Sequence, residues 1–289
     1  MKKVQKLKIK IRMFDYGLAF NIVFLTLIAL FMMLPLVFLV STAFKPLNEL
    51  FVYPPAFFVK SPTFDNFSAL TTSVSSSLVP FVRYAFNSVF VSGAVVFLIV
   101  AISSLAAYPL AKHKFMGKNF LFALVVAALM FAPEVLEIPK YIVISKLGIL
   151  NTYFALILPQ LAFPIGLFLM KQFMEQIPNA IFEAARIDGA SEFKMFKSIA
   201  LPQVKPAWAT IGILCFIQVW GDSSASALLI QNDKLKTLTY YLSTISGTGV
   251  GTAGAAAAAS MLMVLPPVVI FMMLQKKVVS TMVYSGIKA

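Results

Sequence analysis

The sequence is organised around Glu183-Ala184-Ala185-Arg186-Ile187-Asp188-Gly189-Ala190-Ser191, followed by Leu201-Pro202. This stretch is polar and charged, whereas the runs at 152–174 and 207–230 on either side are long and mostly apolar. A helix needs about 20 mostly apolar residues to cross a bilayer, and both runs are long enough. We therefore expect an all-α membrane protein in which this stretch lies outside the lipid, between two transmembrane helices, and contacts another molecule there.

The composition also indicates a membrane protein. Of the 289 residues, 60% are hydrophobic and 12% are charged, whereas soluble domains are about half apolar and about a quarter charged. The net charge of +13 does not predict nucleic-acid binding, because the basic residues fall between apolar runs. Cys215 is the single cysteine, so no disulfide can form within the chain.

The apolar runs predict six transmembrane helices, at about 17–44, 85–111, 119–138, 152–174, 207–230 and 255–275. We expect residues 1–16 to form a basic cytoplasmic N-terminus and residues 17–289 to form a single transmembrane domain. The first apolar run is longer than the apolar part of a signal peptide, so we expect it to remain as a transmembrane helix.

The charge of the loops predicts the orientation. Most of the 24 Lys and Arg residues fall before the first predicted helix, between the second and third, between the fourth and fifth, or after the sixth. Cytoplasmic loops carry such an excess of positive charge, so both termini are expected in the cytoplasm. The loop 175–206 is then cytoplasmic and the loop 45–84 extracytoplasmic. Prolines and a Ser/Thr-rich run at 71–77 argue against regular structure in 45–84.

The loop 175–206 is expected to contain two short helices. Pro178 fits the first turn of one helix, and Gly189 can end that helix because glycine readily adopts a positive φ. Ser191 can cap the second helix. Such a bend of small residues allows another protein to approach the backbone closely.

Two interpretations of this loop surface remain open. Phe182, Phe193 and Phe196 lie beside water unless another surface covers them, which favours a protein partner. Alternatively, the loop is an amphipathic helix pair that rests on the lipid. Glu183 and Arg186 could equally form an exposed pair that contributes little.

Polar groups at the outer ends of two predicted helices are candidates for a translocation path. Glu134 and Glu137 are three residues apart and share a helix face, but they could also be a solvated helix end. Gln218, Trp220 and Asp222 stand near the end of the fifth predicted helix, where polar groups need protein or water to satisfy them. This second cluster is the best pore-lining candidate, with simple packing as the alternative for Trp220.

The sequence contains no recognisable catalytic constellation. It has no Gly-x-x-x-x-Gly-Lys-Ser/Thr phosphate loop and no nucleophile elbow. His113 stands among lysines without a second ligand nearby, so no metal site is expected. If the protein uses ATP, another chain binds it.

At Glu183-Ala184-Ala185, Gly189 and Leu201-Pro202 the sequence resembles the inner permease subunits of bacterial ABC importers. Within them it looks like the carbohydrate branch, the class of the maltose-transporter subunit with a short first loop. The resemblance is dense over 80–289 and loose before it. Further matches in the same order are Asn87-Ser88, Ala106 to Lys112, Gly117-Lys118, Leu147-Gly148, Asn151-Thr152, Phe168-Leu169, Phe173, Ile177-Pro178, Asp188-Gly189-Ala190, Leu265-Pro266, Gln275 and the tail Gly286 to Ala289.

The resemblance implies a non-catalytic permease subunit of a sugar or oligosaccharide importer in the bacterial cytoplasmic membrane. The family partners are a second, homologous permease, two copies of an ATPase and an extracytoplasmic solute-binding protein. The resemblance implies no cofactor on this chain, because ATP and Mg are held by the ATPase.

The resemblance also implies roles for individual residues. In the family, a coupling helix between the fourth and fifth transmembrane helices inserts into a cleft on the ATPase and moves when the ATPase dimer closes. The residues expected at this contact are Phe182, Glu183, Ala184, Ala185, Asp188 and Gly189. Ser285, Gly286 and Lys288 of the tail are also expected near the ATPase pair.

The sequence departs from the family pattern after Trp220. The family commonly has Asn, further aromatic residues and Pro there, whereas this chain has Gly221-Asp222-Ser223-Ser224-Ala225-Ser226. A segment that the family places near the translocation path is therefore smaller and more polar in this chain. A sugar contact inferred there from the family is thus in doubt, and a bulkier substrate could be accommodated.

The alternative function is an autonomous ion-coupled transporter. Glu134, Glu137 or Asp222 would then be the carboxylate that binds the proton or ion. Six helices without a clear inverted repeat, together with the charged loop at 175–206, favour the importer.

Overall fold

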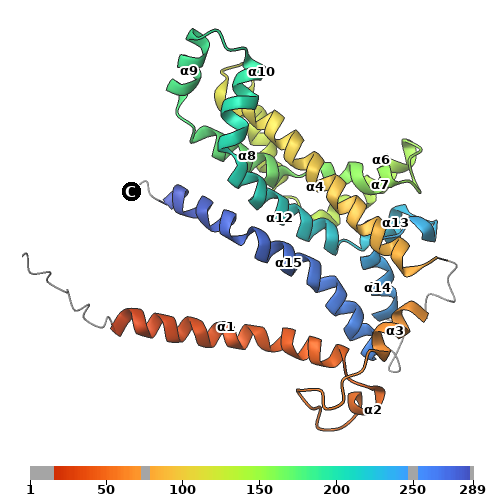
Figure 1. Ribbon diagram of the computed structural model, residues 1–289. Coiled ribbons are helices and arrows are strands. Elements are labelled where there is room, and N and C mark those ends of the chain that lie inside the picture. The colour runs from red at the N-terminus through yellow and green to blue at the C-terminus, as the bar shows by residue number, and fades with distance from the viewer. Residues whose placement is uncertain (1–15, 73–78, 247–252, 287–289) are drawn as a thin grey trace, which may run out of the picture.

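The computed structural model describes residues 16–72, 79–246 and 253–286, and within those ranges every regular element is a helix (Figure 1). The elements in chain order are α1 (Tyr16–Ala43), α2 (Leu47–Leu50), α3 (Asp65–Thr72), α4 (Phe81–Lys112), α5 (Lys118–Ala128), η2 (Pro133–Leu136), α6 (Glu137–Lys146), α7 (Tyr153–Ile157), η3 (Leu158–Leu161), α8 (Pro164–Glu175), α9 (Asn179–Ile187), α10 (Glu192–Met195), η4 (Phe196–Ala200), α11 (Leu201–Gln203), α12 (Lys205–Gly221), α13 (Ser224–Leu229), η5 (Asp233–Leu235), α14 (Leu238–Ser246) and α15 (Ala253–Gly286).

Three of these helices, α1, α4 and α15, are each long and apolar enough to cross a membrane. Three further helix pairs satisfy the same test if each bent pair counts as one span. The first pair, α5 with 133–146, bends by 102°, the second, 153–161 with α8, by 46°, and the third, 192–203 with α12, by 71°. The expected spans near 17–44, 85–111 and 255–275 are therefore continuous helices.

The expected spans 119–138, 152–174 and 207–230 are interrupted rather than continuous. Proline explains two of the breaks, because Pro133 opens η2 and Pro164 opens α8. Proline lacks an amide hydrogen and favours the first turn of a helix, so it starts a new helix more readily than it continues an old one. The third run breaks near Asp222, which has an extended backbone after α12 and before α13.

The core has two parts. The larger part joins α4, α8 and α12, and its fully buried side chains include Val95, Ile99, Met170 and Ile211. The smaller part joins α14 and α15 to α3 and the end of α1. Apolar side chains that interlock at these helix crossings supply the packing that holds helices together within lipid.

Helix α1 diverges from the rest of the bundle and meets α15 near its own C-terminal end (Figure 1). No residue of its most apolar window is buried within the chain. Phe31 and Met32, for example, are 74% and 70% exposed. This apolar surface must be covered by lipid or by another protein.

The expectation of no regular structure in the loop 45–84 is wrong for its described part. This loop contains α2 and α3, and the Glu49 carboxylate accepts backbone hydrogen bonds from Lys60 (3.0 Å) and Ser61 (2.9 Å). The hydrogen bond from the Lys60 amide lowers the pKa of Glu49. Asn66 of α3 donates to the carbonyls of Ala43 and Lys45. Residues 73–78 of the loop lie outside the described residues.

Candidate functional site

The segment 175–206 folds as a helix–turn–helix. Helix α9 ends where Gly189 adopts a φ of 76° and the Ala190 amide donates to the Ala185 carbonyl at 2.9 Å. This pattern satisfies carbonyls at the helix end that would otherwise lack partners. Ser191 caps α10 by accepting a hydrogen bond from the Lys194 amide at 3.3 Å. The predicted positions of Gly189 and Ser191 are confirmed.

One face of the segment is exposed and rich in small residues. It carries Glu183, Ala184, Asp188 and Gly189, all of which are exposed. Ile187 lies beside them and is 87% exposed. The sequence analysis did not single out Ile187, although its spacing of four from Glu183 places both residues on one side of a helix. A surface of this kind can receive the backbone and apolar groups of a protein partner.

Phe182 and Phe196 do not face water, contrary to the expectation. They are 3% and 8% exposed, whereas Phe193 is 69% exposed. The ring of Tyr108 in α4 packs against both buried rings, with centroid distances of 6.1 Å and 5.3 Å. Ala185 is half-buried and packs against the same core. Phe182 and Ala185 therefore fix α9 from the inside.

A polar network joins this segment to the end of α4. The Glu192 carboxylate accepts hydrogen bonds from the Tyr108 hydroxyl at 3.1 Å and from Arg186 at 3.1 Å. His113 Nε2 lies 3.3 Å from the same carboxylate. The possible pair between Glu183 and Arg186 is wrong, because Arg186 binds Glu192 instead. Sequence reasoning missed Glu192 and Tyr108, since nothing in the local spacing connects α4 to α10.

His113 stands between Lys112 and Lys114 at the end of α4. No group of three or more His, Cys, Asp or Glu residues that could hold a metal ion occurs in the described part of the chain. The neighbouring Lys112 ammonium binds the Ile177 carbonyl at 2.5 Å and the Asn179 side chain at 3.1 Å. Through these contacts Lys112, at the C-terminal end of α4, holds the start of α9 in place.

Trp220 packs as a core residue. It is 6% exposed, stacks on Phe216 at 5.4 Å between ring centroids, and donates from Nε1 to the Met263 carbonyl at 2.9 Å. Its own carbonyl accepts a hydrogen bond from Thr239 at 2.5 Å. Trp220 thereby ties α12 to α14 and α15. Gln218, two residues earlier, is exposed.

Asp222 is engaged by groups of the chain itself. One carboxylate oxygen accepts from Gln160 Nε2 at 2.7 Å. The other accepts from the Ser224 hydroxyl at 2.8 Å and the Ala225 amide at 3.1 Å. The side chain therefore stabilises the start of α13 and connects it to η3.

Glu134 and Glu137 lie in the first turns of η2 and α6. Carboxylates are favourable there because the N-terminus of a helix carries partial positive charge. Glu134 is exposed and Glu137 half-buried. No salt bridge within 4.0 Å joins either one to Lys140, a statement that covers the described residues only. The structure does not connect these two carboxylates to Asp222 by any hydrogen bond within the same ranges.

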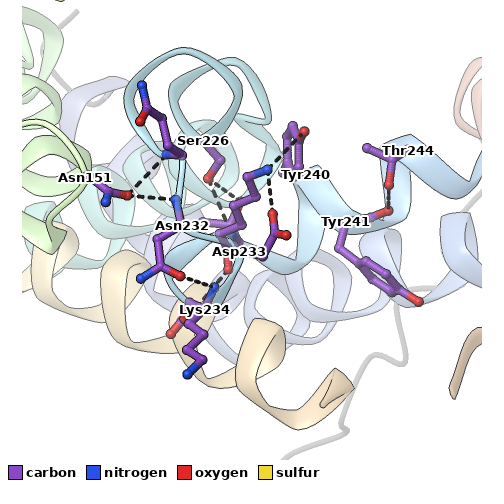
Figure 2. Close-up of polar contacts among 12 residues, drawn as sticks. Asn151, Ser226, Asn232, Asp233, Lys234, Tyr240, Tyr241 and Thr244 are labelled. Carbon is purple, nitrogen blue, oxygen red and sulfur yellow. Dashed lines mark hydrogen bonds and ion pairs between the residues drawn. The ribbon is translucent and has the colours of Figure 1, made fainter. Parts of the chain in front are cut away.

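A buried polar cluster fixes the segment 230–238 at the other end of α4. Asn87 is 0% exposed; it donates to the carbonyls of Lys234 (2.9 Å) and Lys236 (2.8 Å) and accepts from the Tyr153 hydroxyl. Figure 2 shows the neighbouring contact, in which the Asn151 side chain accepts from the backbone of this segment. The sequence analysis named Asn87 and Asn151 only as family matches, and the structure assigns them these contacts.

The tail residues are described only in part. Helix α15 continues to Gly286, so Ser285 and Gly286 belong to it. Lys288 lies outside the described residues.

A family model described as "Binding-protein-dependent transport system inner membrane component" matches residues 12–284. The chain belongs to this family. The permease is accordingly a multi-pass inner-membrane transport component, as its several apolar helices indicate.

Curated relatives of the permease include transport proteins for carbohydrates. The arabinooligosaccharides transport system permease protein AraQ of Halalkalibacterium halodurans is 32% identical over 234 residues, which cover 79% of this chain and 80% of AraQ. Protein LplC of Bacillus subtilis is 34% identical over 221 residues, covering 75% of this chain and 70% of LplC.

A solved structure has the same fold. It is a bacterial ABC transporter involved in the import of the acidic polysaccharide alginate, and one of its chains superposes with a TM-score of 0.76. The identity is 21%, and the alignment covers 90% of this chain and 95% of that one.

Proposed function

We propose that this permease is the transmembrane subunit of an ATP-driven ABC importer for a sugar or oligosaccharide. Its assembly would contain a second, homologous permease, a homodimeric ATPase and an extracytoplasmic solute-binding protein. Family membership and the names of the relatives support this proposal, since AraQ serves arabinooligosaccharides and MelC of Bacillus subtilis serves melibiose, raffinose and stachyose. The solved alginate importer was also determined in complex with a binding protein.

The proposal includes six membrane spans with both termini in the cytoplasm. We take as the six spans the helices α1, α4 and α15, the two bent pairs α5 with 133–146 and 153–161 with α8, and helix α12. The distribution of Lys and Arg places the segment 175–206 on the cytoplasmic side. The bends are compatible with a membrane because backbone groups freed at a break can be satisfied by neighbouring protein.

The observation that carries the proposal is the exposed face of α9. Glu183, Ala184, Asp188 and Gly189, with Ile187, are the residues that we place against the ATPase. Small side chains let a partner approach the backbone closely, and contact would bury the exposed Ile187, which stabilises a complex. We do not place Phe182 and Ala185 at the ATPase contact itself, because they face the core and hold α9 against α4. ATP and Mg would bind the partner, since this chain has no phosphate loop.

The first experiment tests this coupling face. We expect Glu183→Lys and Gly189→Asp to leave the subunit inserted in the membrane while ATPase co-purification and uptake are lost. Gln203→Ala serves as the matched control, because its side chain bonds only within its own helical run, to the Ile199 carbonyl. Normal assembly and uptake in both variants would refute the assignment. Ser285, Gly286 and Lys288 are proposed as a second contact, which truncation after 284 tests in the same assay.

The substrate path is a separate part of the proposal. Gln218, Trp220, Asp222, Glu134 and Glu137 were its sequence candidates. We propose that Trp220 and Asp222, which are held by contacts within the chain, shape the path, and that Gln218, whose side chain is exposed, meets the substrate. Gln218→Ala is expected to change the range of transported oligosaccharides, and Asp222→Ala and Trp220→Ala to lower uptake. Unchanged uptake and substrate range in all three would exclude this location.

The autonomous ion-coupled transporter is disfavoured by family membership. The contacts of Asp222 add to this, because both of its oxygens already accept hydrogen bonds from the chain. Uptake that collapsed with a protonophore but survived loss of the ATPase would reverse this conclusion.

A further inference from the structure

An apolar stripe follows one face of α4 from its first turn to its middle. Val82, Phe86, Val89, Gly93 and Phe97 recur at spacings of three or four residues, so they lie one above another along the helix. All of them are exposed. Because α4 is long and apolar enough to cross a membrane, this face meets either lipid or another membrane protein.

The stripe forms one wall of an apolar groove. Helix α12 lies between α4 and α15 and contacts both (Figure 1). The groove has a volume of about 630 Å³, and its lining includes Val89, Gly93 and Phe97 of α4, Gly212 of α12 and Ile270 of α15. Every residue that lines it is apolar or aromatic. Sugar hydroxyls that are buried without hydrogen bonds cost free energy, so the groove suits hydrocarbon rather than the transported sugar.

The groove is as long as one leaflet of a bilayer is deep. Its lining on α4 extends from Val89 to Val100, about 16 Å along an α-helix, and half of the hydrocarbon core of a bilayer is about 15 Å. Glycines on two helices keep the groove open. A β-carbon on Gly93 would meet nothing within 4 Å, and one on Gly212 would meet Val96 at 3.6 Å. An extended acyl chain therefore fits into it.

Two cations stand at the first turn of α4, where the stripe begins. A second hollow of about 440 Å³ is lined there by Val82, Arg83 and Phe86 of α4 and by Lys234 of η5. Arg83 donates from Nε to the Lys234 carbonyl at 3.1 Å and from Nη2 to the Tyr153 hydroxyl at 3.2 Å. Its guanidinium carbon lies 5.7 Å from the centroid of the Phe86 ring. A guanidinium has more N–H donors than these two hydrogen bonds use, so further donors remain for a ligand.

No acidic side chain pairs with these two cations in the part of the chain that the structure describes. Asp233, next to Lys234, pairs with Lys236 at 2.7 Å instead. Figure 2 shows the side chain of Lys234 pointing away from Asp233. Lys234 is exposed. Basic side chains at the edge of the apolar region of a membrane attract anionic lipids, so the charge and the stripe favour the same ligand.

We propose that this face of α4 binds one anionic phospholipid of the outer leaflet. The phosphodiester lies at Arg83 and Lys234, and an acyl chain follows Val89, Gly93 and Phe97 along the groove. The leaflet follows from the proposed orientation, which places the start of α4 on the extracytoplasmic side. The inference otherwise goes beyond the proposed function, because it requires neither an ATPase nor a sugar.

A helix from a second permease is the competing occupant of the groove. Helix α1 shows what such a helix offers, since it is apolar and its residues 16–43 include no charged side chain. A helix of this kind would cover the groove but would leave Arg83 and Lys234 without an anionic partner. Charge complementarity therefore favours the phospholipid.

The test measures which lipid the full-length permease retains. The protein is purified in detergent and incubated with equal amounts of phosphatidylglycerol and phosphatidylcholine that carry the same acyl chains. Native mass spectrometry then counts the lipids on each permease. We expect one retained lipid, with phosphatidylglycerol preferred, because the choline group adds a positive charge next to the two cations. An unaltered permease that retains neither lipid, or both equally, would overturn the site.

Lys234→Gln tests the headgroup contact. It should lower the ratio of retained phosphatidylglycerol to phosphatidylcholine about fivefold, the typical contribution of one basic side chain to the attraction of an anionic lipid. Lys60→Gln is the matched control, because it removes an exposed ammonium from the same side of the membrane but outside the hollow. The same ratio in both variants would contradict the assignment.

Gly93→Leu tests the groove. It should lower the retention of both lipids about tenfold and leave their ratio unchanged, because the leucine side chain displaces methylene groups of the acyl chain from apolar contact. A β-carbon on Gly93 meets nothing within 4 Å, so we expect the variant to fold. Unchanged retention in the folded variant would show that no acyl chain lies in the groove.

Photocrosslinking in the complete complex distinguishes a lipid from a second permease. Phe97 lines the groove and is exposed, so it is replaced by benzoylphenylalanine. The complex is then irradiated in nanodiscs that contain phosphatidylglycerol. We expect the mass of the permease to increase by one phospholipid. A crosslink to the second permease instead would assign the groove to that subunit and overturn the lipid site.

Discussion

Gly254 allows α15 to approach α3 more closely than any other residue type would. A β-carbon at this position would lie 2.2 Å from Oδ1 of Asn66. The Asn66 side chain is held in place, because its amide nitrogen donates to the carbonyls of Ala43 at 2.9 Å and Lys45 at 2.8 Å. The contact therefore joins three parts of the chain at the outer end of α1.

We expect Gly254→Ala to lower the free energy of unfolding by about 1–3 kcal/mol, since the added methyl group overpacks this contact. Thermal unfolding of the purified subunit in detergent measures the change. Gly93→Ala in α4 is the control, because a β-carbon there meets nothing within 4 Å. The Gly93→Ala variant should leave the free energy of unfolding unchanged or raise it by up to about 1 kcal/mol. Equal stability losses in both variants would contradict the overpacking.

At the scale of residues, sequence reasoning succeeded where the cause is local. Gly189 and Ser191 were placed correctly because a positive φ and a helix cap depend on neighbouring backbone alone. The partner of Arg186 was not predictable, because the choice between Glu183 and Glu192 depends on how α9 and α10 pack. The burial of Phe182 depends likewise on α4, whose position no local pattern specifies.

At the scale of elements, the break between α12 and α13 depends on Asp222. Its carboxylate accepts from the Ala225 amide in the first turn of α13 and from Gln160 in η3. Charged acceptors form stronger hydrogen bonds than neutral ones and cap helices well.

We therefore expect Asp222→Ala to destabilise the permease by about 1–2 kcal/mol, in line with the loss of a helix cap. Faster hydrogen exchange at 224–229 than in the unaltered permease would locate the loss in α13. Ser223→Ala is the matched control, since Ser223 provides no side-chain cap to that helix. If the exchange at 224–229 is the same in all three proteins, Asp222 does not hold the break.

The long helices were predictable as elements, and the breaks were not. Apolar runs near 17–44, 85–111 and 255–275 were long enough to predict α1, α4 and α15. The breaks in 119–138 and 207–230 coincide with Pro133 and Asp222, but each run is apolar enough over its whole length to be read as a single span. Apolar content therefore reports the surroundings of a segment but not its direction.

At the scale of the whole molecule, the orientation rests on loop charge and can be measured directly. Met116 follows α4 and is 101% exposed, and Tyr53 in the loop after α1 is 93% exposed. We expect a membrane-impermeant maleimide to label Tyr53→Cys in intact spheroplasts, and Met116→Cys only after permeabilisation, because Lys-rich loops stay in the cytoplasm. The reverse pattern would invert the orientation.

The general class of the molecule was evident from the sequence because composition and span length both reflect the membrane. The contacts at the two ends of α4 were not, since they join residues that are 84 and 147 positions apart. Such pairs become visible only when the helices are placed in space.

The isolation of α1 has a consequence for biogenesis. This helix contains no charged residue, and no residue of its most apolar window is buried within the chain, so its insertion does not have to wait for the helices that follow. It can leave the translocon while the rest of the chain is still being synthesised, and it then anchors the growing polypeptide to the bilayer. The bent spans lack this independence, because their interrupted backbones need neighbouring helices to satisfy them. We therefore expect α1 to insert first and on its own, and the bent spans to assemble later and together.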